Sequence, residues 1–288
     1  STDPHLSEYV APHWKSREWI SGFTGSAGTV VITTSQAGLW TDSRYFLQAA
    51  QQLKGTEIKL YKEMLPETPS ISAFLSTQLT PGDAVGIDGK MFSAEEAERM
   101  QAELQKCQIK VKSISDPLDK LWTDRPPMPE APAFIYETQY AGKSSIEKIA
   151  IIRKELKKCN AKALFLSALD EIAWTLNLRG NDVHCNPVLV SYLLIEENET
   201  HYFIQPQKIT AEVATYMKET GVNLHTYEEA EAYLSRISVE SLLLNPAKTN
   251  YTMYSAVNPD CRIIHGASPV TLLKAIRNEQ EIAGIHAA

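Results

Sequence analysis

The sequence has little of several features that would point to particular classes of protein. Its four cysteines, Cys107, Cys159, Cys185 and Cys261, are widely scattered, with no C-x-x-C pair. Free thiols in a reducing cytosol are the simplest interpretation, rather than disulfides or a zinc site. No apolar run approaches the length that crosses a bilayer. The first residues lack the charged-then-apolar pattern of a signal peptide. We therefore expect a cytoplasmic protein with no membrane partner.

The chain also has fewer basic than acidic residues. The formal net charge is -7, which argues against a nucleic-acid partner because phosphate binding needs a basic surface. What is present fits a globular protein: 43% of the residues are hydrophobic and 22% are charged. At 288 residues the chain exceeds one typical domain, so we expect two.

Two segments share one order of predicted elements. Each has a tryptophan, then a polar or glycine-rich loop, a strand, a turn, a strand and a helix. Capping boxes predict helices that begin after Ser93 (with Glu96) and after Ser144 (with Glu147). A duplicated α/β unit explains this repeated order of elements, and its hairpins require mixed sheets. The other predicted elements are strands at 29–33, 38–41, 84–88, 111–114, 163–167, 188–195, 201–205 and 242–244, and helices at 43–53, 208–219, 227–237 and 269–288.

Residues 121–132 contain four prolines, which predicts an extended linker between the two segments. Three stretches on either side of and within this linker point to a known family. They are WTDSRYFLQAA (residues 40–50), LWTDRPPMP (residues 121–129) and LDEIAWTLNLRGNDVHCNPVLVSY (residues 169–192). These stretches resemble the three-domain aminopeptidases P of the pita-bread metallopeptidase family. The resemblance implies an α/β chain of two tandem creatinase N-terminal-like domains at 1–119 and 134–268, joined by a linker at 120–133. Residues 269–288 then start a truncated catalytic domain. A short apolar strand is expected ahead of Ser1.

The family resemblance also implies a function. Members are Xaa-Pro aminopeptidases, which release an N-terminal residue that precedes proline. In them a pair of divalent metal ions, usually manganese, is held by two Asp, one His and two Glu of the catalytic domain. We expect those ligands beyond residue 288, so this chain alone is predicted to be inactive and to hold no metal. The expected partners are a peptide substrate, the chain's own catalytic domain and a second copy in a homodimer. A non-enzymatic protein-binding module on the same fold is the alternative, and a prolidase-like dipeptidase is a weaker one.

Arg44 is the predicted substrate-binding residue. In the family the arginine of the WTD-x-RYF motif reaches toward the active-site cleft, and a guanidinium suits a peptide carboxylate or carbonyl. The alternatives are an internal salt bridge with Asp42 and an ordinary surface charge. Asp42 is expected to order the turn or to pair with Arg44. The glycines at 22, 25 and 28 fit tight turns better than a phosphate loop.

Other polar residues receive structural interpretations. Asp170 and Glu171 are expected to cap a helix rather than bind metal. The loop with Arg179 and Asp182 is expected to face the catalytic domain or its cleft, although an ordinary Asx-turn loop is equally compatible. His184 and Cys185 are adjacent but have no partner pair nearby, and the remaining histidines, His201 and His225 among them, show no ligand spacing.

Overall fold

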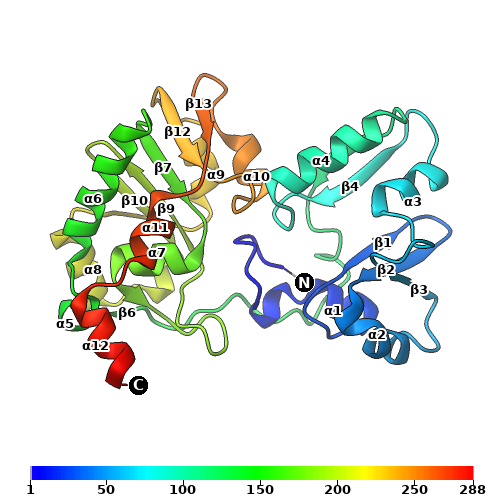
Figure 1. Ribbon diagram of the computed structural model, residues 1–288, viewed down its shortest axis with the longest axis horizontal. Helices are drawn as coiled ribbons and strands as arrows, with labels where there is room; N and C mark the ends of the chain where they lie inside the picture. Colours follow the sequence, from blue (N-terminus) through cyan, green and yellow to red (C-terminus); the bar gives the residue numbers. More distant parts are fainter. Residues whose placement is uncertain (1, 288) are drawn as a thin grey trace.

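The computed structural model describes residues 2–287, which form two α/β units lying side by side (Figure 1). The N-terminal unit is blue to cyan, and the second unit is green to red. Between β5 and β6 the proline-rich segment contains turns but no helix or strand. Among the described residues, no helix is long and apolar enough to span a membrane.

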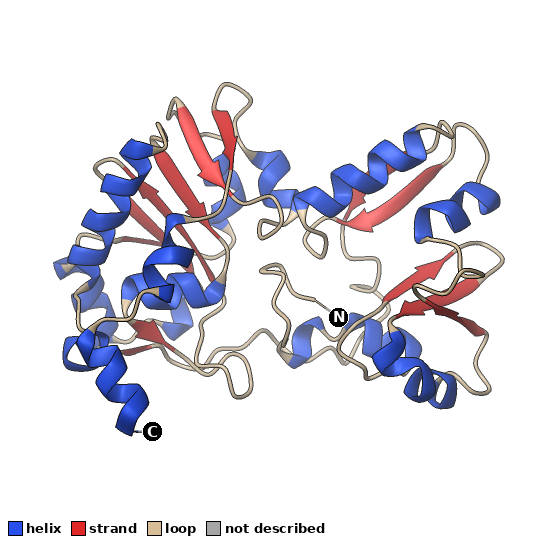
Figure 2. Ribbon diagram, viewed as in Figure 1, coloured by secondary structure: helices blue, strands red, loops and turns tan. Residues whose placement is uncertain are grey.

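The first unit contains a three-stranded sheet and a separate pair of parallel strands (Figure 2). In the larger sheet β1 and β2 are antiparallel, whereas β2 and β3 are parallel. The predicted helix at 43–53 begins as a turn of 3₁₀ helix, and the sequence analysis missed both β3 and α3. The elements are η1 (Pro12–Trp14), α1 (Ser16–Ser21), β1 (Thr29–Ile32), β2 (Ala37–Thr41), η2 (Ser43–Tyr45), α2 (Phe46–Gln52), β3 (Ile58–Lys62), α3 (Ile71–Gln78), β4 (Ala84–Asp88), α4 (Ala94–Gln105) and β5 (Lys110–Ile114).

Aromatic packing holds the first unit together. The rings of Trp40 and Tyr61 stack with centroids 3.9 Å apart, and Phe74 from α3 packs edge-on against Trp40. Gly38 leaves room for this stack, because a Cβ there would lie 2.6 Å from both rings. A larger residue at position 38 would therefore have to displace the core.

The second unit contains one six-stranded mixed sheet of order β11-β10-β9-β7-β12-β13 and a small two-stranded sheet of β6 and β8. Strands β7, β10 and β12 are buried at every residue, which explains their near-continuous apolar runs. The elements are β6 (Phe134–Ile135), α5 (Thr138–Ala141), α6 (Ser145–Lys158), β7 (Ala163–Leu166), α7 (Leu169–Leu176), β8 (Leu178–Arg179), β9 (Ser191–Glu196), β10 (Thr200–Ile204), η3 (Pro206–Lys208), α8 (Ala211–Glu219), β11 (Asn223–His225), α9 (Glu229–Leu234), β12 (Ser241–Leu244), α10 (Tyr251–Ala256), β13 (Arg262–His265), α11 (Pro269–Ala275) and α12 (Glu279–Ala287).

Helices cover both faces of the six-stranded sheet. Helices α6, α7, α8 and α11 supply one core, in which Ile152 and Met217 are fully buried. Helices α9 and α10 supply the other core, which contains Leu234 and Met253. Both predicted capping boxes are confirmed, at the starts of α4 and α6. The α/β fold with two similar units, each of sheets flanked by helices, is thus as expected.

The two units repeat one topology with a difference. The order β1-β2-β3 corresponds to β9-β10-β11, and the parallel pair β4-β5 corresponds to β12-β13. In the second unit β7 lies between β9 and β12, antiparallel to one and parallel to the other. Among the described residues of the first unit, no strand lies between β1 and β4, and residues of both strands line a hollow of about 630 Å³. The strand expected ahead of residue 1 remains a prediction.

The last predicted helix, at 269–288, is wrong as a single element. It divides into α11 and α12, and residue 288 lies outside the described residues. The Asn278 side chain accepts a hydrogen bond from the Glu281 N–H, and the Glu281 carboxylate accepts one from the Asn278 N–H. This reciprocal pair starts a new helix because it satisfies N–H groups that the first turn leaves without partners.

Hydrogen bonds join the two units at the start of α4. The N–H of Ala94 donates to the carbonyl of Thr249, and the N–H of Tyr251 donates to the carbonyl of Phe92. The first residues of the chain also lie on the second unit, where the Asn250 amide donates to the carbonyl of Pro4 at 2.6 Å. We call residues 3–6 the N-terminal strap.

Candidate functional site

Arg44 lies in the turn that connects β2 to α2. The carboxylate of Asp42 caps this turn by accepting the Arg44 N–H at 3.0 Å. The same carboxylate accepts two bonds from the guanidinium, from Nε at 2.9 Å and from Nη2 at 2.8 Å. The salt bridge foreseen as the alternative is therefore present, and it holds the guanidinium in one orientation on the protein surface.

The Arg44 side chain is 64% exposed, so pairing with Asp42 leaves it accessible. Its guanidinium carbon lies 5.3 Å from the centre of the Tyr45 ring. The hydrogen bond from Arg44 lowers the pKa of Asp42, whereas burial, and then the charge of Asp42, raise the pKa of Glu63. Such an exposed pair contributes little to stability. The turn therefore presents an oriented cation at its surface.

The predicted capping role of Asp170 is wrong. The residue before α7 is Ala168, which makes no side-chain cap, and Asp170 in the first turn forms an ion pair with Lys274 of α11. Glu171 is buried, and its carboxylate accepts a hydrogen bond from the hydroxyl of Thr271. Burial raises the pKa of Glu171. These carboxylates attach α11 to the second unit.

The polar loop after α7 is tied into the fold. Arg179 donates to the carbonyls of Ala173 and Leu178. Asp182 belongs to the loop expected to face the catalytic domain or its cleft, and it is buried in an ion pair with Lys208. His184 and Cys185 are both exposed. Asp182 therefore serves the fold here rather than a surface site.

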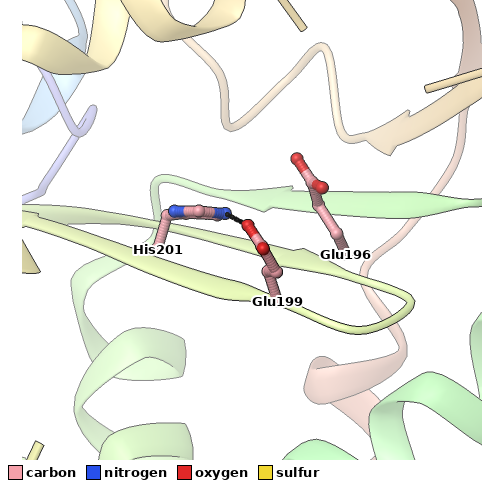
Figure 3. Close-up of side chains that lie close together, drawn as sticks. All are labelled: Glu196, Glu199 and His201. Atoms are coloured by element: carbon pink, nitrogen blue, oxygen red, sulfur yellow. Dashed lines mark ion pairs between the residues drawn. The ribbon is translucent and has the colours of Figure 1, made fainter. Parts of the chain in front are cut away.

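The structure brings together a group that the sequence analysis missed. Glu196 ends β9, Glu199 precedes β10, and His201 is the second residue of β10. One ligand atom from each of the three lies within 4.8 Å of the others (Figure 3). The residues are five positions apart at most, but only the hairpin turns their side chains to one side. A Glu-x-x-Glu-x-His run across a hairpin turn was the available signal.

His201 is the buried member of this group, with 3% of its surface exposed. Its Nε2 lies 3.1 Å from Glu199 Oε2 and 2.9 Å from the Tyr233 hydroxyl. Its Nδ1 lies 3.0 Å from Nε2 of His225. Burial, together with His225, lowers the pKa of His201 despite the opposing charge of Glu199. The ring is thus fixed by partners on both nitrogens.

Comparison with known proteins accounts for nearly the whole chain. Family models described as the creatinase/prolidase N-terminal domain match residues 4–121 and residues 124–281. The chain is 38% identical to the Xaa-Pro aminopeptidase ApepP of Drosophila melanogaster, over 99% of this chain and 47% of the relative. It is 33% identical to aminopeptidase P2 of Arabidopsis thaliana, over 99% of this chain and 45% of the relative.

A solved structure agrees with these relatives. The X-prolyl aminopeptidase of Caenorhabditis elegans, described as a cytosolic enzyme with a di-nuclear active site, superposes with a TM-score of 0.92 at 30% identity. The match covers 100% of this chain and 48% of that one. The chain therefore spans about half the length of the relatives that it matches.

Proposed function

Because the chain belongs to the creatinase/prolidase N-terminal domain family, we propose that it is the N-terminal, non-catalytic half of a Xaa-Pro aminopeptidase. The observation that carries this proposal is that N-terminal-domain family models match both units, in order, while the chain spans about half the length of the aminopeptidases that it matches. The substrate would be a peptide with proline in second position.

A di-nuclear metal centre does not fit the described residues of this chain. The three-residue metal-ligand group found among residues 2–287 comprises two glutamates and one histidine. The centre implied by the family needs two Asp, one His and two Glu. We therefore assign the reaction to the other half of the parent protein.

The role proposed for the two units is control of access. Placed beside a catalytic domain, they would narrow the approach to its cleft, so that short peptides enter and folded proteins do not. Arg44 would then act as a substrate clamp. Its bond to Asp42 orients a planar donor fork, and its exposure leaves it available to a peptide carbonyl or carboxylate.

The test is Arg44→Ala in the full-length protein. The variant should raise KM, or lower kcat/KM, for longer peptides while metal content stays intact, because only a contact with the distal part of the substrate is removed. Arg99→Ala is the matched control, since it removes an exposed arginine of the same unit. If Arg44→Ala leaves the peptide-length profile unchanged, Arg44 has no part in substrate binding.

We further propose a manganese pair in the parent, a homodimer and a cytoplasmic location. The alternative, a binding module without activity, is disfavoured by the aminopeptidase names of the relatives. Hydrolysis of a Xaa-Pro peptide by the full-length protein separates the two. A folded parent that binds protein partners but cleaves no such peptide would support the alternative.

A further inference from the structure

The β9–β10 hairpin carries a cluster whose chemistry the proposed peptidase function does not use. Its members are Glu196, Glu199 and His201, one nitrogen and two oxygen donors within 4.8 Å of one another (Figure 3). We propose that these three residues bind one divalent transition-metal ion, and that zinc is the best match. Zinc accepts imidazole nitrogen and carboxylate oxygen together, whereas calcium and magnesium prefer oxygen alone.

The surroundings of His201 resemble those of a metal-binding histidine. A metal-binding histidine usually donates its other ring N–H to a fixed partner, which sets the tautomer. Here Nδ1 of His201 lies 3.0 Å from Nε2 of His225, and the His225 ring is itself stacked on Phe203. With the proton on Nδ1, the Nε2 lone pair points toward the carboxylate of Glu199.

In that tautomer the Nε2 lone pair of His201 faces the negative carboxylate of Glu199, and a cation between them would remove the repulsion. The Nε2 lone pair and the Glu199 carboxylate, 3.1 Å apart, repel each other unless a proton or a metal ion lies between them. Without metal, the proton can sit on Nε2 and bond to Glu199, with His225 donating to Nδ1. A metal ion would replace that proton, and the Tyr233 hydroxyl would have to give up its contact with Nε2.

Hydrogen bonds from Arg153 of α6 hold the hairpin turn in place. Arg153 of α6 donates from Nε to the carbonyl of Glu196 at 2.8 Å and from Nη2 to the carbonyl of Glu199 at 2.9 Å. The backbone of Glu196 also donates to Glu199 at 2.9 Å. The backbone positions of both carboxylates are therefore fixed, and only their side chains need to rotate to close around an ion.

The surface beside the cluster favours a cation. A hollow of about 710 Å³ adjoins it and gives access to water, which could fill a fourth coordination position. Its lining carries four carboxylates and two cationic groups, a balance of two negative charges. The charged lining residues are Lys162, Glu196, Glu197, Glu199, Arg236 and Glu240.

The experiment is a zinc titration of the metal-free 288-residue chain against a chromophoric chelator. Wild type should bind one ion at the hairpin. Glu199→Gln, at an exposed position, should weaken binding at least about tenfold. His225→Phe should weaken it by about 10–100-fold, as loss of a residue that orients a metal-binding histidine does. Glu197→Gln is the matched control, because it removes the same charge from the same turn and its carboxylate points to Lys157 instead. It should weaken zinc binding far less than Glu199→Gln does.

Several results would overturn the proposal. One is no zinc binding by wild type in the micromolar range. Another is equal loss in the Glu197→Gln and Glu199→Gln variants, which would indicate general attraction to negative charge. A third is a cobalt(II) spectrum with thiolate bands, since Cys107, Cys159 and Cys185 are exposed. In support, ring ¹⁵N shifts should show His201 bound through Nε2 and protonated at Nδ1.

Discussion

Acid should weaken the attachment of the N-terminal strap through one residue, His5. Its ring is 3% exposed and packs on Tyr192, with centroids 4.4 Å apart. Its Nδ1 lies 2.9 Å from the carbonyl of Ser167, so Nδ1 carries the proton, and Nε2 accepts from the Tyr227 hydroxyl at 3.0 Å. Burial lowers the pKa of His5 to about 4, although Asp3 and the Ser167 carbonyl oppose the shift and Lys208 adds to it.

The sign of the effect follows from this shift. An unfolded histidine titrates near its ordinary pKa of 6.5, whereas folded His5 titrates at about 4. Stability from the neutral ring is therefore complete above the unfolded pKa and is lost as the pH falls between those two values. The loss should reach about 2 kcal/mol at about pH 5 and approach about 3 kcal/mol below both pKa values.

The assay compares wild type with His5→Asn by urea unfolding across this pH range. Asparagine keeps a donor for the Ser167 carbonyl but does not titrate, so the stability difference between the two proteins should shrink or reverse as the pH falls. His184→Asn, which replaces an exposed histidine in the same way, is the matched control. A stability difference for His5→Asn that stays constant with pH, or an NMR titration of His5 near 6.5, would refute the reasoning.

Local features of the chain could be predicted because they depend on near neighbours. The capping boxes at Ser93 and Ser144 require only a hydroxyl and a glutamate three residues later, and both formed. The same reciprocal pattern, with the amide oxygen of Asn278 in place of a hydroxyl and Glu281 three residues later, would have located the break between α11 and α12. The sequence analysis did not apply this pattern there and predicted one helix at 269–288.

The strap and the hairpin cluster depend on contacts that no local pattern contains. His5 meets Ser167 and Tyr227 across more than 160 positions of sequence, so its burial becomes visible only in the folded chain. Glu199 and His201 are near neighbours, but their convergence with His225 requires the parallel pairing of β10 with β11. The substrate contact proposed for Arg44 would depend on the proposed catalytic half of the parent protein, so it stays a prediction.

Two further predictions concern the cores of the two units. Lys208→Met should lower the free energy of unfolding by about 3–5 kcal/mol, because it leaves Asp182 charged and fully buried without its partner. Adding Asp182→Asn should recover part of that loss. Lys157→Met is the control at an exposed lysine and should cost little. Equal losses of stability for the two lysine variants in urea unfolding would contradict the argument. Gly38→Ala should cost about 1–3 kcal/mol and alter tryptophan fluorescence, because the new methyl group would lie 2.6 Å from the stacked rings of the first unit. Gly284→Ala is the control, because position 284 lies in a helix with no atom within 4 Å of the added Cβ, and it should be neutral or stabilising. A loss of stability in this variant as large as that in Gly38→Ala would show that crowding is not the cause.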